Sequence, residues 1–390
     1  MSSGKLLAEL KSSNKKIFIQ FGGQGAPYIK ELTKLYKDEP GLERFFQVSF
    51  NAVNDFQSKL GKDPLFEQGM DIQKWLEYPE ATPDEAYLAQ GSVSITTIFI
   101  TQMANYYKFV LNGYPVSELV GLAAGATGHS QGILAAYLAS LAKEGDEFYE
   151  TLDKFVKFAC HLGYRAQQNY TEFTIPEDLL KKSEELGDKS QPSPMAACLG
   201  YSKDELESRV NFFNEELAKS EEEKVYISLY NAPTAMIISG LPQQLVRFRE
   251  KYINEMTEKK CKFVYLRTTA PFHSPHCGKT FDAFKNDLKE KVDFPYGAED
   301  IKIPLYSFVD GLNFQDKTGN INETIFDEIV IQNLHWSKAI ANALQDSVDV
   351  ILDCGPSKTV AGITSTHVKD LELPTRVLCL SNPKDLKVIY

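Results

Sequence analysis

The first 170 residues combine short apolar runs with longer segments that carry apolar residues at helical spacing. The run IFIQF at 17–21 leads into the glycines of GGQG, which predicts a buried strand followed by a tight turn. The same criteria predict helices over 28–70, 82–113, 133–140 and 146–170, and an apolar, glycine-rich strand over 117–128.

A different rhythm follows the polar, proline-bearing stretch 171–194, which we interpret as the lead-in to a second unit. Its strands are predicted at PMAACLG, KVYISLYN, AMIISG and KFVYLRTT, and its helices at SKDELESRVNFFNEELAKS and LPQQLVRFREKYINEM. The order βαββαβ over 194–269 is that of a split-βαβ, ferredoxin-like module. APFHSPH then returns the chain to the larger unit, which ends in the strand, glycine turn and helix start of VDVILDCGPSKTVAGIT.

The pentapeptide GHSQG at 128–132 lies between the predicted strand and the helix-forming run ILAAYLAS. Strand, Gly-x-Ser-x-Gly, helix is the pattern of a nucleophile elbow, in which the serine lies on a strained turn and the next helix directs free N–H groups at it. Ser130 is therefore a candidate nucleophile. The alternative is a glycine-rich loop whose serine only caps the helix.

A serine nucleophile needs a base, and His273 in PFHS is the best candidate because it lies where a strand gives way to a loop. His129 adjoins the serine, but neighbouring residues on an elbow point in different directions. His276 is explained by packing. HSPH is the only close histidine pair, so no metal site is expected.

Charge and composition restrict the partners. The net charge of −11 argues against nucleic acid or an anionic membrane as the main partner. No apolar run is long enough to span a bilayer, and no signal peptide is recognisable. The six cysteines are scattered without a C-x-x-C motif, which suits free thiols in the cytoplasm.

FGGQG, GATGHSQG, NAPTAMIISG, APFHS and ILDCGP occur in that order, and together they resemble the acyl-CoA:acyl-carrier-protein transacylases. The chain is most similar to the acetyltransferase domain of the fungal fatty acid synthase β subunit, over about residues 15–380. The resemblance implies an α/β-hydrolase-like parallel-sheet core, here 1–193 and 270–390, with the ferredoxin-like subdomain 194–269 inserted.

The resemblance also implies the role of each site residue. Ser130 is the nucleophile, His273 the base, and the backbone N–H groups of Gln24 and Gln131 form the oxyanion hole. Asn231 matches an asparagine that holds the small subdomain against the cleft. In this family the histidine donates a hydrogen bond to a main-chain carbonyl. That carbonyl is expected within IVIQNLHWSKAI, and Gln332 and Asn333 are both candidates for it.

The implied reaction passes an acyl group from acyl-CoA to Ser130 and then to the phosphopantetheine thiol of an acyl carrier protein, without a metal or redox cofactor. Malonyl-transferring members hold the carboxylate with the arginine of an R-G pair. If that glycine is Gly163, the arginine position is Leu162, which favours acetyl or another uncharged acyl group. Arg165 lies one turn further along the helix, and a shifted alignment would make it the carboxylate partner, so malonyl transfer stays as the alternative. Without such a shift, Arg165 makes a structural contact or binds the pantetheine phosphate.

Two more distant alternatives use the same motifs. A serine esterase or thioesterase would need an acid and a later histidine, for which Asp349 or Asp353 with His367 are available. A non-catalytic copy of the fold is disfavoured by the intact motifs. Carrier proteins are usually acidic, so docking would need a local basic patch, and motif proximity suggests Lys157, Arg165, Arg267 and Lys358. The sequence does not distinguish a free-standing enzyme from a synthase domain.

Overall fold

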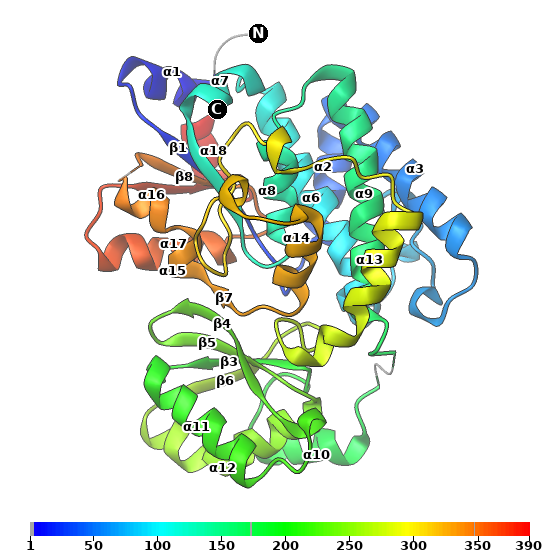
Figure 1. Cartoon of the computed structure of the whole chain (residues 1–390), viewed down its shortest axis with the longest axis vertical. Coiled ribbons are helices and arrows are strands. Elements are labelled where there is room, and N and C mark those ends of the chain that lie inside the picture. Colours follow the sequence, from blue (N-terminus) through cyan, green and yellow to red (C-terminus); the bar gives the residue numbers. More distant parts are fainter. Residues whose placement is uncertain (1–3, 172–173, 347) are drawn as a thin grey trace.

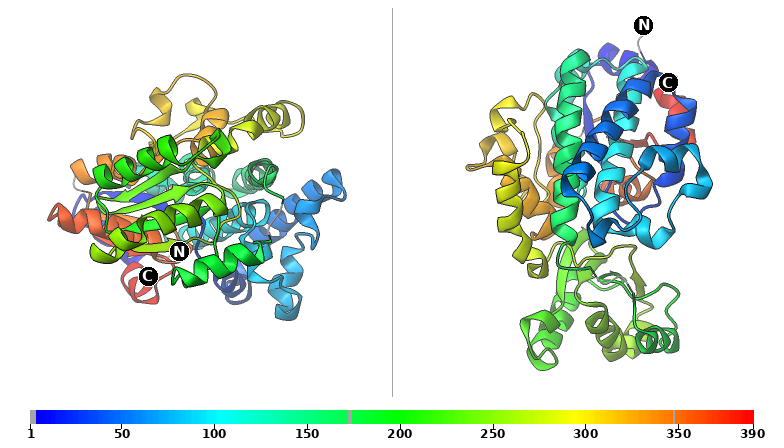
Figure 2. Two further views of the ribbon diagram at one scale, coloured as in Figure 1. Left: turned by 90° about the horizontal axis from the view of Figure 1, so that it is seen from below. Right: turned by 90° about the vertical axis from the view of Figure 1, so that its right-hand side faces the viewer.

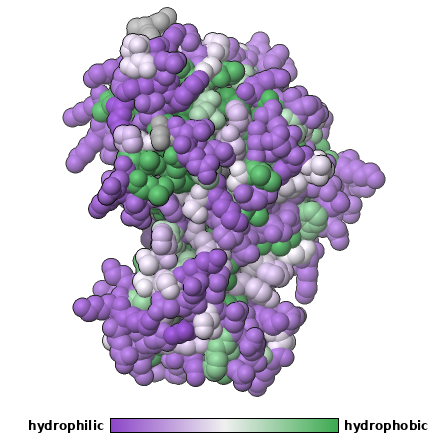
Figure 3. Space-filling model, turned by 60° about the vertical axis from the view of Figure 1, so that its left-hand side comes forward, coloured by the Kyte–Doolittle hydropathy of each residue, from purple (hydrophilic) through white to green (hydrophobic). Residues whose placement is uncertain are grey.

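The computed structural model of the chain describes residues 4–171, 174–346 and 348–390. It has a larger and a smaller lobe (Figures 1 and 2). The chain enters the smaller lobe at 170–195 and leaves it at 265–275, and one short strand described below returns to it. The surface drawn in Figure 3 is mostly hydrophilic and narrows between the lobes.

The larger lobe contains a four-stranded sheet in the order β2-β1-β8-β9, and every pairing in it is parallel. The strands are β1 (Ile17–Phe21), β2 (Ala123–Gly128), β8 (Val350–Asp353) and β9 (Arg376–Cys379). β1 and β8 are buried along their whole length, as expected of parallel strands covered on both faces. Figure 1 shows α3, α6 and α9 to the right of this sheet and α15, α16 and α17 below the strands labelled β1 and β8.

The helices outside the inserted module are α1 (Lys5–Ser12), α2 (Ile29–Asp38), α3 (Glu43–Leu60), α4 (Ile72–Glu77), α5 (Glu85–Ala89), α6 (Gly91–Leu111), α7 (Val116–Leu122), α8 (Gly132–Ser140), α9 (Gly145–Gln167), α10 (Glu177–Glu185), α13 (Phe281–Glu290), α14 (Ile321–Val330), α15 (Trp336–Ala339), α16 (Ala341–Gln345), α17 (Thr359–Asp370) and α18 (Pro383–Ile389). Among them, α6 and α9 pack closely along each other and form much of the core behind the sheet.

The smaller lobe is built on a five-stranded sheet in the order β6-β3-β5-β4-β7. Its elements are β3 (Met195–Leu199), α11 (Lys203–Glu216), β4 (Tyr226–Ala232), β5 (Ala235–Ser239), α12 (Pro242–Glu258), β6 (Lys262–Tyr265) and β7 (Leu334–His335). The first four strands pair antiparallel with the βαββαβ connectivity, which confirms the ferredoxin-like module. β7 was not predicted; it belongs to the returning chain and pairs parallel with β4.

Alternate residues of the small sheet belong to two different cores. Ala196 and Cys198 on β3 pack with α11 and α12 in a separate apolar cluster, whereas Met195 and Ala197 belong to the core of the larger lobe. The sheet is thus covered by its own helices on one face and by the larger lobe on the other.

The division into 1–193 with 270–390 and 194–269 remains our proposal, and one observation bears on its first boundary. α10 lies before residue 194 but packs against α12, and Leu179 and Leu186 adjoin the apolar cluster of the smaller lobe. In the lead-in segment 171–194, residues 172–173 lie outside the described residues.

Three predicted elements differ from the structure. The region predicted as helical at 28–70 forms α2 and α3, which are separated by residues 39–42, and α3 ends at Leu60. The strand predicted at 117–128 begins only at Ala123, because Val116 and Leu119 are buried at helical spacing in α7. The single helix predicted at 82–113 is broken at Gln90, whose φ of −56° and ψ of 135° are not helical. The chain at Gly91 passes so close to Gln167 and Phe272 that a Cβ there would lie 2.7 Å and 2.9 Å from their side chains.

Candidate active site

Ser130 lies on the turn between β2 and α8, as the elbow motif predicts. Its φ of 55° is in the left-handed region, where a non-glycine residue is strained. The flanking glycines are required by close packing: a Cβ at Gly128 would lie 1.9 Å from the backbone of Gly132, and one at Gly132 would lie 2.4 Å from the carbonyl oxygen of Gly22. The turn therefore holds a serine in a fixed, buried position against the end of β1.

His273 meets the serine directly. The Ser130 hydroxyl donates to His273 Nε2 over 2.7 Å, and His273 Nδ1 donates to the Gln332 carbonyl oxygen over 2.8 Å. The backbone N–H of His273 also donates to the Val330 carbonyl over 2.8 Å, which secures a residue whose φ is 56°. Because Nδ1 carries the proton, Nε2 is free to accept the serine proton.

The structure selects Gln332 over Asn333 as the source of the supporting carbonyl. Gln332 directly precedes β7, whose pairing with β4 fixes this segment against the small sheet. The Asn333 side chain is turned away and donates to the Ile227 carbonyl. Among the described residues, no carboxylate bonds to His273, so this is a serine–histidine pair rather than a triad.

Burial controls the charge of the histidine. His273 is almost wholly inaccessible to solvent, and this desolvation lowers its pKa from 6.5 to about 4. The neighbouring His129 is lowered to about 4 for the same reason. Both rings are therefore neutral at pH 7, and His273 is in the form that can accept a proton.

Gln24 follows β1 and Gln131 follows the serine, and their role as oxyanion donors stays a prediction. Gln131 is the N-cap residue of α8, and neither its backbone N–H nor that of Gln24 has an acceptor among the described residues. Their side chains are held by the first turn of α6: Gln24 Nε2 donates to Ser94 Oγ over 2.5 Å, and Gln131 Nε2 donates to the Ile95 carbonyl over 3.2 Å. Sequence patterns gave no indication of this role for Ser94.

Asn231 links the smaller lobe to the elbow. His129 Nε2 donates to Asn231 Oδ1 over 2.8 Å, and His367 Nε2 donates to the Asn231 carbonyl over 2.8 Å. The ring of Trp336 lies against His129, with centroids 5.3 Å apart. His129 thus connects the two lobes through its hydrogen bond to Asn231, a role that the sequence did not reveal.

The acid and histidine of the esterase alternative do not form a triad with Ser130. Asp353 is buried and accepts from Gln20 Nε2 over 2.6 Å, while His367 bonds to the Asn231 carbonyl. Asp349 accepts from the backbone of Lys16. These three side chains serve structural contacts, and Ser130 instead has His273.

The two candidate selectivity residues lie on α9. Leu162 is fully buried, and the next residue, Gly163, packs against the first turn of α6. Arg165 forms a bidentate pair with Asp287, with Nε–Oδ2 at 2.6 Å and Nη2–Oδ1 at 2.8 Å. Asp287 is buried, and the partners Arg165, His161 and Lys291 hold its pKa well below the usual value. This pairing engages the guanidinium that the malonyl alternative would assign to a substrate carboxylate.

Three of the four residues suggested for a basic docking patch are paired with carboxylates, whereas Lys358 is the N-cap residue of α17. The docking patch itself stays a prediction. Lys157 pairs with Asp153 at 2.9 Å and Asp55 at 3.2 Å, and Arg165 is engaged by Asp287. Arg267 contacts Glu85 over 3.0 Å at the protein surface. His276 Nε2 donates to the Lys224 carbonyl, which fits the packing role expected of it.

A strained serine after a parallel strand, a buried histidine and an inserted split-βαβ module define an α/β protein with a serine–histidine site of the kind used in acyl transfer. Residues 19–273 match the family described as starter unit:ACP transacylase in aflatoxin biosynthesis. The chain belongs to this family of acyl carrier protein transacylases.

Curated relatives include the fatty acid synthase subunit beta of Saccharomyces cerevisiae, 29% identical over 375 residues, and the fatty acid synthase beta subunit TOXC of Cochliobolus carbonum, 26% identical over 390 residues. These alignments cover 91% and 95% of this chain but only 18% of each relative. The chain therefore spans less than a fifth of the length of these relatives.

Solved structures with the same fold include an acyl-carrier-protein S-malonyltransferase from Bartonella henselae, with a TM-score of 0.67, 18% identity, and coverage of 95% of this chain and 97% of that one. A type II polyketide synthase acyl carrier protein in complex with its malonyl-transacylase matches with a TM-score of 0.66 and 15% identity, covering 96% and 98%. At these identities the likeness concerns the fold.

Among the described residues, no helix is both long and apolar enough to cross a membrane. Within the same residues, no group of three or more histidine, cysteine, aspartate or glutamate side chains is arranged to hold a metal ion.

Proposed function

We propose that this chain is an acyl-CoA:[acyl carrier protein] S-acyltransferase of fatty acid or polyketide synthesis that works in the cytoplasm. The observation that carries the proposal is the 2.7 Å hydrogen bond from the strained Ser130 to a neutral His273 whose Nδ1 is fixed by Gln332. Membership of the starter unit:ACP transacylase family and the solved complex of a carrier protein with its malonyl-transacylase support acyl-CoA and acyl carrier protein as the two substrates.

In the acylation step, His273 Nε2 takes the proton of Ser130 while Oγ attacks the thioester carbonyl. The backbone N–H groups of Gln24 and Gln131 stabilise the tetrahedral oxyanion, at about 3 kcal/mol per donor. The C–S bond then breaks, and the proton on His273 passes to the thiolate of the departing CoA. The acyl group remains on Ser130 as an ester. No metal or redox cofactor takes part in this scheme.

The second half-reaction reverses these steps with the phosphopantetheine thiol of a carrier protein. His273 takes the thiol proton, sulfur attacks the ester, and the serine oxygen leaves with the proton returned to it. The burial of Ser130 and His273 supports transfer over hydrolysis, because water has little access to the ester.

We propose acetyl or another uncharged acyl group as the group transferred. Leu162 cannot pair with a carboxylate, and Arg165 is neutralised by Asp287, so a malonyl carboxylate would lose hydration without gaining a cation. Malonyl transfer is the alternative, and the solved malonyltransferases with this fold are the observation in its favour.

Labelled acyl-CoA tests the proposal when it is supplied with and without a carrier protein. Without carrier protein we expect a stable acyl-enzyme, and with carrier protein we expect rapid transfer of the label to it. Ser130→Ala should not become labelled, because that variant lacks the attacking oxygen. Circular dichroism of Ser130→Ala checks that the fold is intact. Release of free acid at the same rate with or without carrier would identify a thioesterase instead, and undiminished labelling of Ser130→Ala would place the nucleophile elsewhere.

A further inference from the structure

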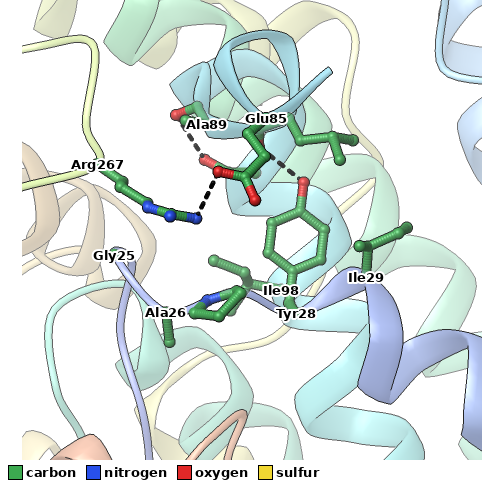
Figure 4. A pocket seen from close by; sticks show the side chains of 11 residues that line it. Gly25, Ala26, Tyr28, Ile29, Glu85, Ala89, Ile98 and Arg267 are labelled. Carbon is green, nitrogen blue, oxygen red and sulfur yellow. Dashed lines mark hydrogen bonds and ion pairs between the residues drawn. The ribbon is translucent and has the colours of Figure 1, made fainter. Parts of the chain in front are cut away.

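Two adjoining cavities lie between α5, the segment after β1 and the end of the small sheet. The smaller, of about 60 Å³, is lined mainly by apolar side chains, including those of Tyr28, Leu88 and Ile98, and it reaches Gly25 next to Gln24 (Figure 4). The larger, of about 750 Å³, has a mixed polar lining that includes Thr268 and Thr269, a few residues before His273. Its size suits a cofactor-sized ligand.

The two cavities share the side chains of Glu85 and Arg267. Glu85 begins α5 in the larger lobe, Arg267 follows β6 in the smaller one, and Arg267 Nη1 lies 3.0 Å from Glu85 Oε2 at the mouth of the small cavity (Figure 4). Lys189 also lines the large cavity. The linings of the two cavities therefore contain the cationic side chains of Arg267 and Lys189, and the smaller cavity, which reaches Gly25, is otherwise mainly apolar.

Both substrates of the proposed reaction share one chemical arm, in which a phosphate is joined to a mostly uncharged pantetheine chain that ends in sulfur. A guanidinium is a favourable partner for the phosphate, because it can bind two phosphate oxygens at once. The uncharged chain is expected to bind in the apolar cavity. Building on the proposed function, we infer that Arg267, assisted by Lys189, forms a phosphate subsite for the pantetheine arm.

The ion pair with Glu85 is suited to being exchanged for a substrate. Both side chains are more than half exposed, at 56% and 79%, and such surface pairs add little net stability. A phosphate that approaches Arg267 therefore replaces one loosely held anion by another. Glu85 then acts as an internal competitor, and its removal should favour binding.

The first test is Arg267→Gln, measured with acetyl-CoA and with acetyl-pantetheine, which lacks the phosphate. We expect the KM for acetyl-CoA to rise about tenfold, equivalent to about 1.4 kcal/mol, while the KM for acetyl-pantetheine stays within twofold. Arg44→Gln is the matched control, because Arg44 pairs with Asp146 at nearly the same exposures, 58% and 79%, and does not line either cavity. An equal rise for both thioesters would overturn the subsite.

The second test is Glu85→Gln, which should lower the KM for acetyl-CoA and leave that for acetyl-pantetheine unchanged. Holo-carrier protein as acceptor distinguishes the two sources of phosphate in Arg267→Gln. A higher KM for both acetyl-CoA and holo-carrier protein supports a subsite for the arm that they share. A higher KM for only one of them assigns the subsite to that substrate, and an unchanged KM for both excludes the subsite.

Failure of the proposed function is distinguishable from failure of this inference. A wild-type protein that no thioester acylates would contradict the proposed function. Calorimetric binding of CoA and of pantetheine to the same variants still tests the subsite, because it needs no chemistry. Equal losses of affinity for the two ligands, or none, would reject it there too.

Discussion

His273 combines burial with a fixed proton on Nδ1, and this combination determines how activity should depend on pH. A neutral Nε2 is needed to accept the Ser130 proton, and burial lowers the pKa of the ring to about 4. Lowering the pKa of a histidine extends the range in which it is neutral toward acid, so the base stays competent well below the ordinary value of 6.5.

We therefore expect the acylation rate, as kcat/KM, to be level between about pH 7 and 5 and to fall only as the pH approaches about 4. The measurement is a pH profile of acyl-enzyme formation, limited to the range where circular dichroism is unchanged. His273→Ala should lose about 10²–10⁴-fold at pH 7. His276→Ala is the control, because its ring bonds to a carbonyl away from Ser130. An acid limb centred near 6.5 would contradict this account of the site.

Arg165 and Leu162 determine the prediction on the acyl group. The wild type should transfer acetyl with at least about a tenfold higher kcat/KM than malonyl, which needs only ~1.4 kcal/mol between the transition states. Arg165→Ala should leave this ratio unchanged but lower the free energy of unfolding by about 3 kcal/mol, since it strips a buried partner from Asp287. Denaturation and competition assays check both. A preference for malonyl that Arg165→Ala abolishes would show that Arg165 serves the substrate.

At the scale of elements, the first turn of α6 supports both proposed oxyanion donors. Ser94 Oγ accepts from the Gln24 side chain, and Ile95 presents its carbonyl to the Gln131 side chain. This turn exists because the chain breaks at Gln90 instead of continuing one long helix from residue 82. The break follows from close packing of Gly91 against Gln167 and Phe272, a contact between distant segments that no local pattern encodes.

We predict that Ser94→Ala lowers the kcat of acylation about tenfold with little change in KM, because the Gln24 backbone is then less firmly placed for the transition state only. Ser94→Thr keeps a hydroxyl and should restore most of the rate. Single-turnover kinetics with saturating acetyl-CoA give the comparison. A change confined to KM, or no rescue by threonine, would argue against a positioning role for Ser94.

The secondary structure that was predictable from sequence is the part with strong periodicity. The run at 17–21, the elbow and the βαββαβ order correspond to β1, the β2–α8 turn and the small module. The error at 117–128 arose because apolar and glycine residues suit either a strand or a short helix, and the burial of Val116 and Leu119 decides for α7. Short apolar segments carry too little periodicity for that decision.

At the scale of the whole molecule, the site depends on a joint between the two lobes. Ser130 comes from the larger lobe, the Gln332 carbonyl is placed by β7 at the edge of the small sheet, and His129 bonds to Asn231 on β4. The motifs predicted Ser130 and His273, but Ser94, β7 and the bond of His129 to Asn231 needed the structure, because each depends on segments that meet only after folding.

The final prediction concerns this joint. Asn231→Ala removes the acceptor of the His129 ring and leaves a buried N–H without a partner, which should cost about 1–3 kcal/mol of unfolding free energy. The rate of acylation should fall as well, because His129 directly precedes the nucleophile and its own N–H bonds to the end of β1. His129→Ala removes the same bond from the other side.

A double-mutant cycle isolates the contribution of the bond. If the two side chains act through it, the double variant Asn231→Ala with His129→Ala should be less destabilised than the sum of the two single variants, since neither polar group is then left unpaired. Ser92→Ala is a control for a buried polar side chain that belongs to the larger lobe alone, bonding to the Leu65 carbonyl. Strict additivity of the two substitutions, in both unfolding free energy and acylation rate, would mean that the lobes are held at the site by other contacts.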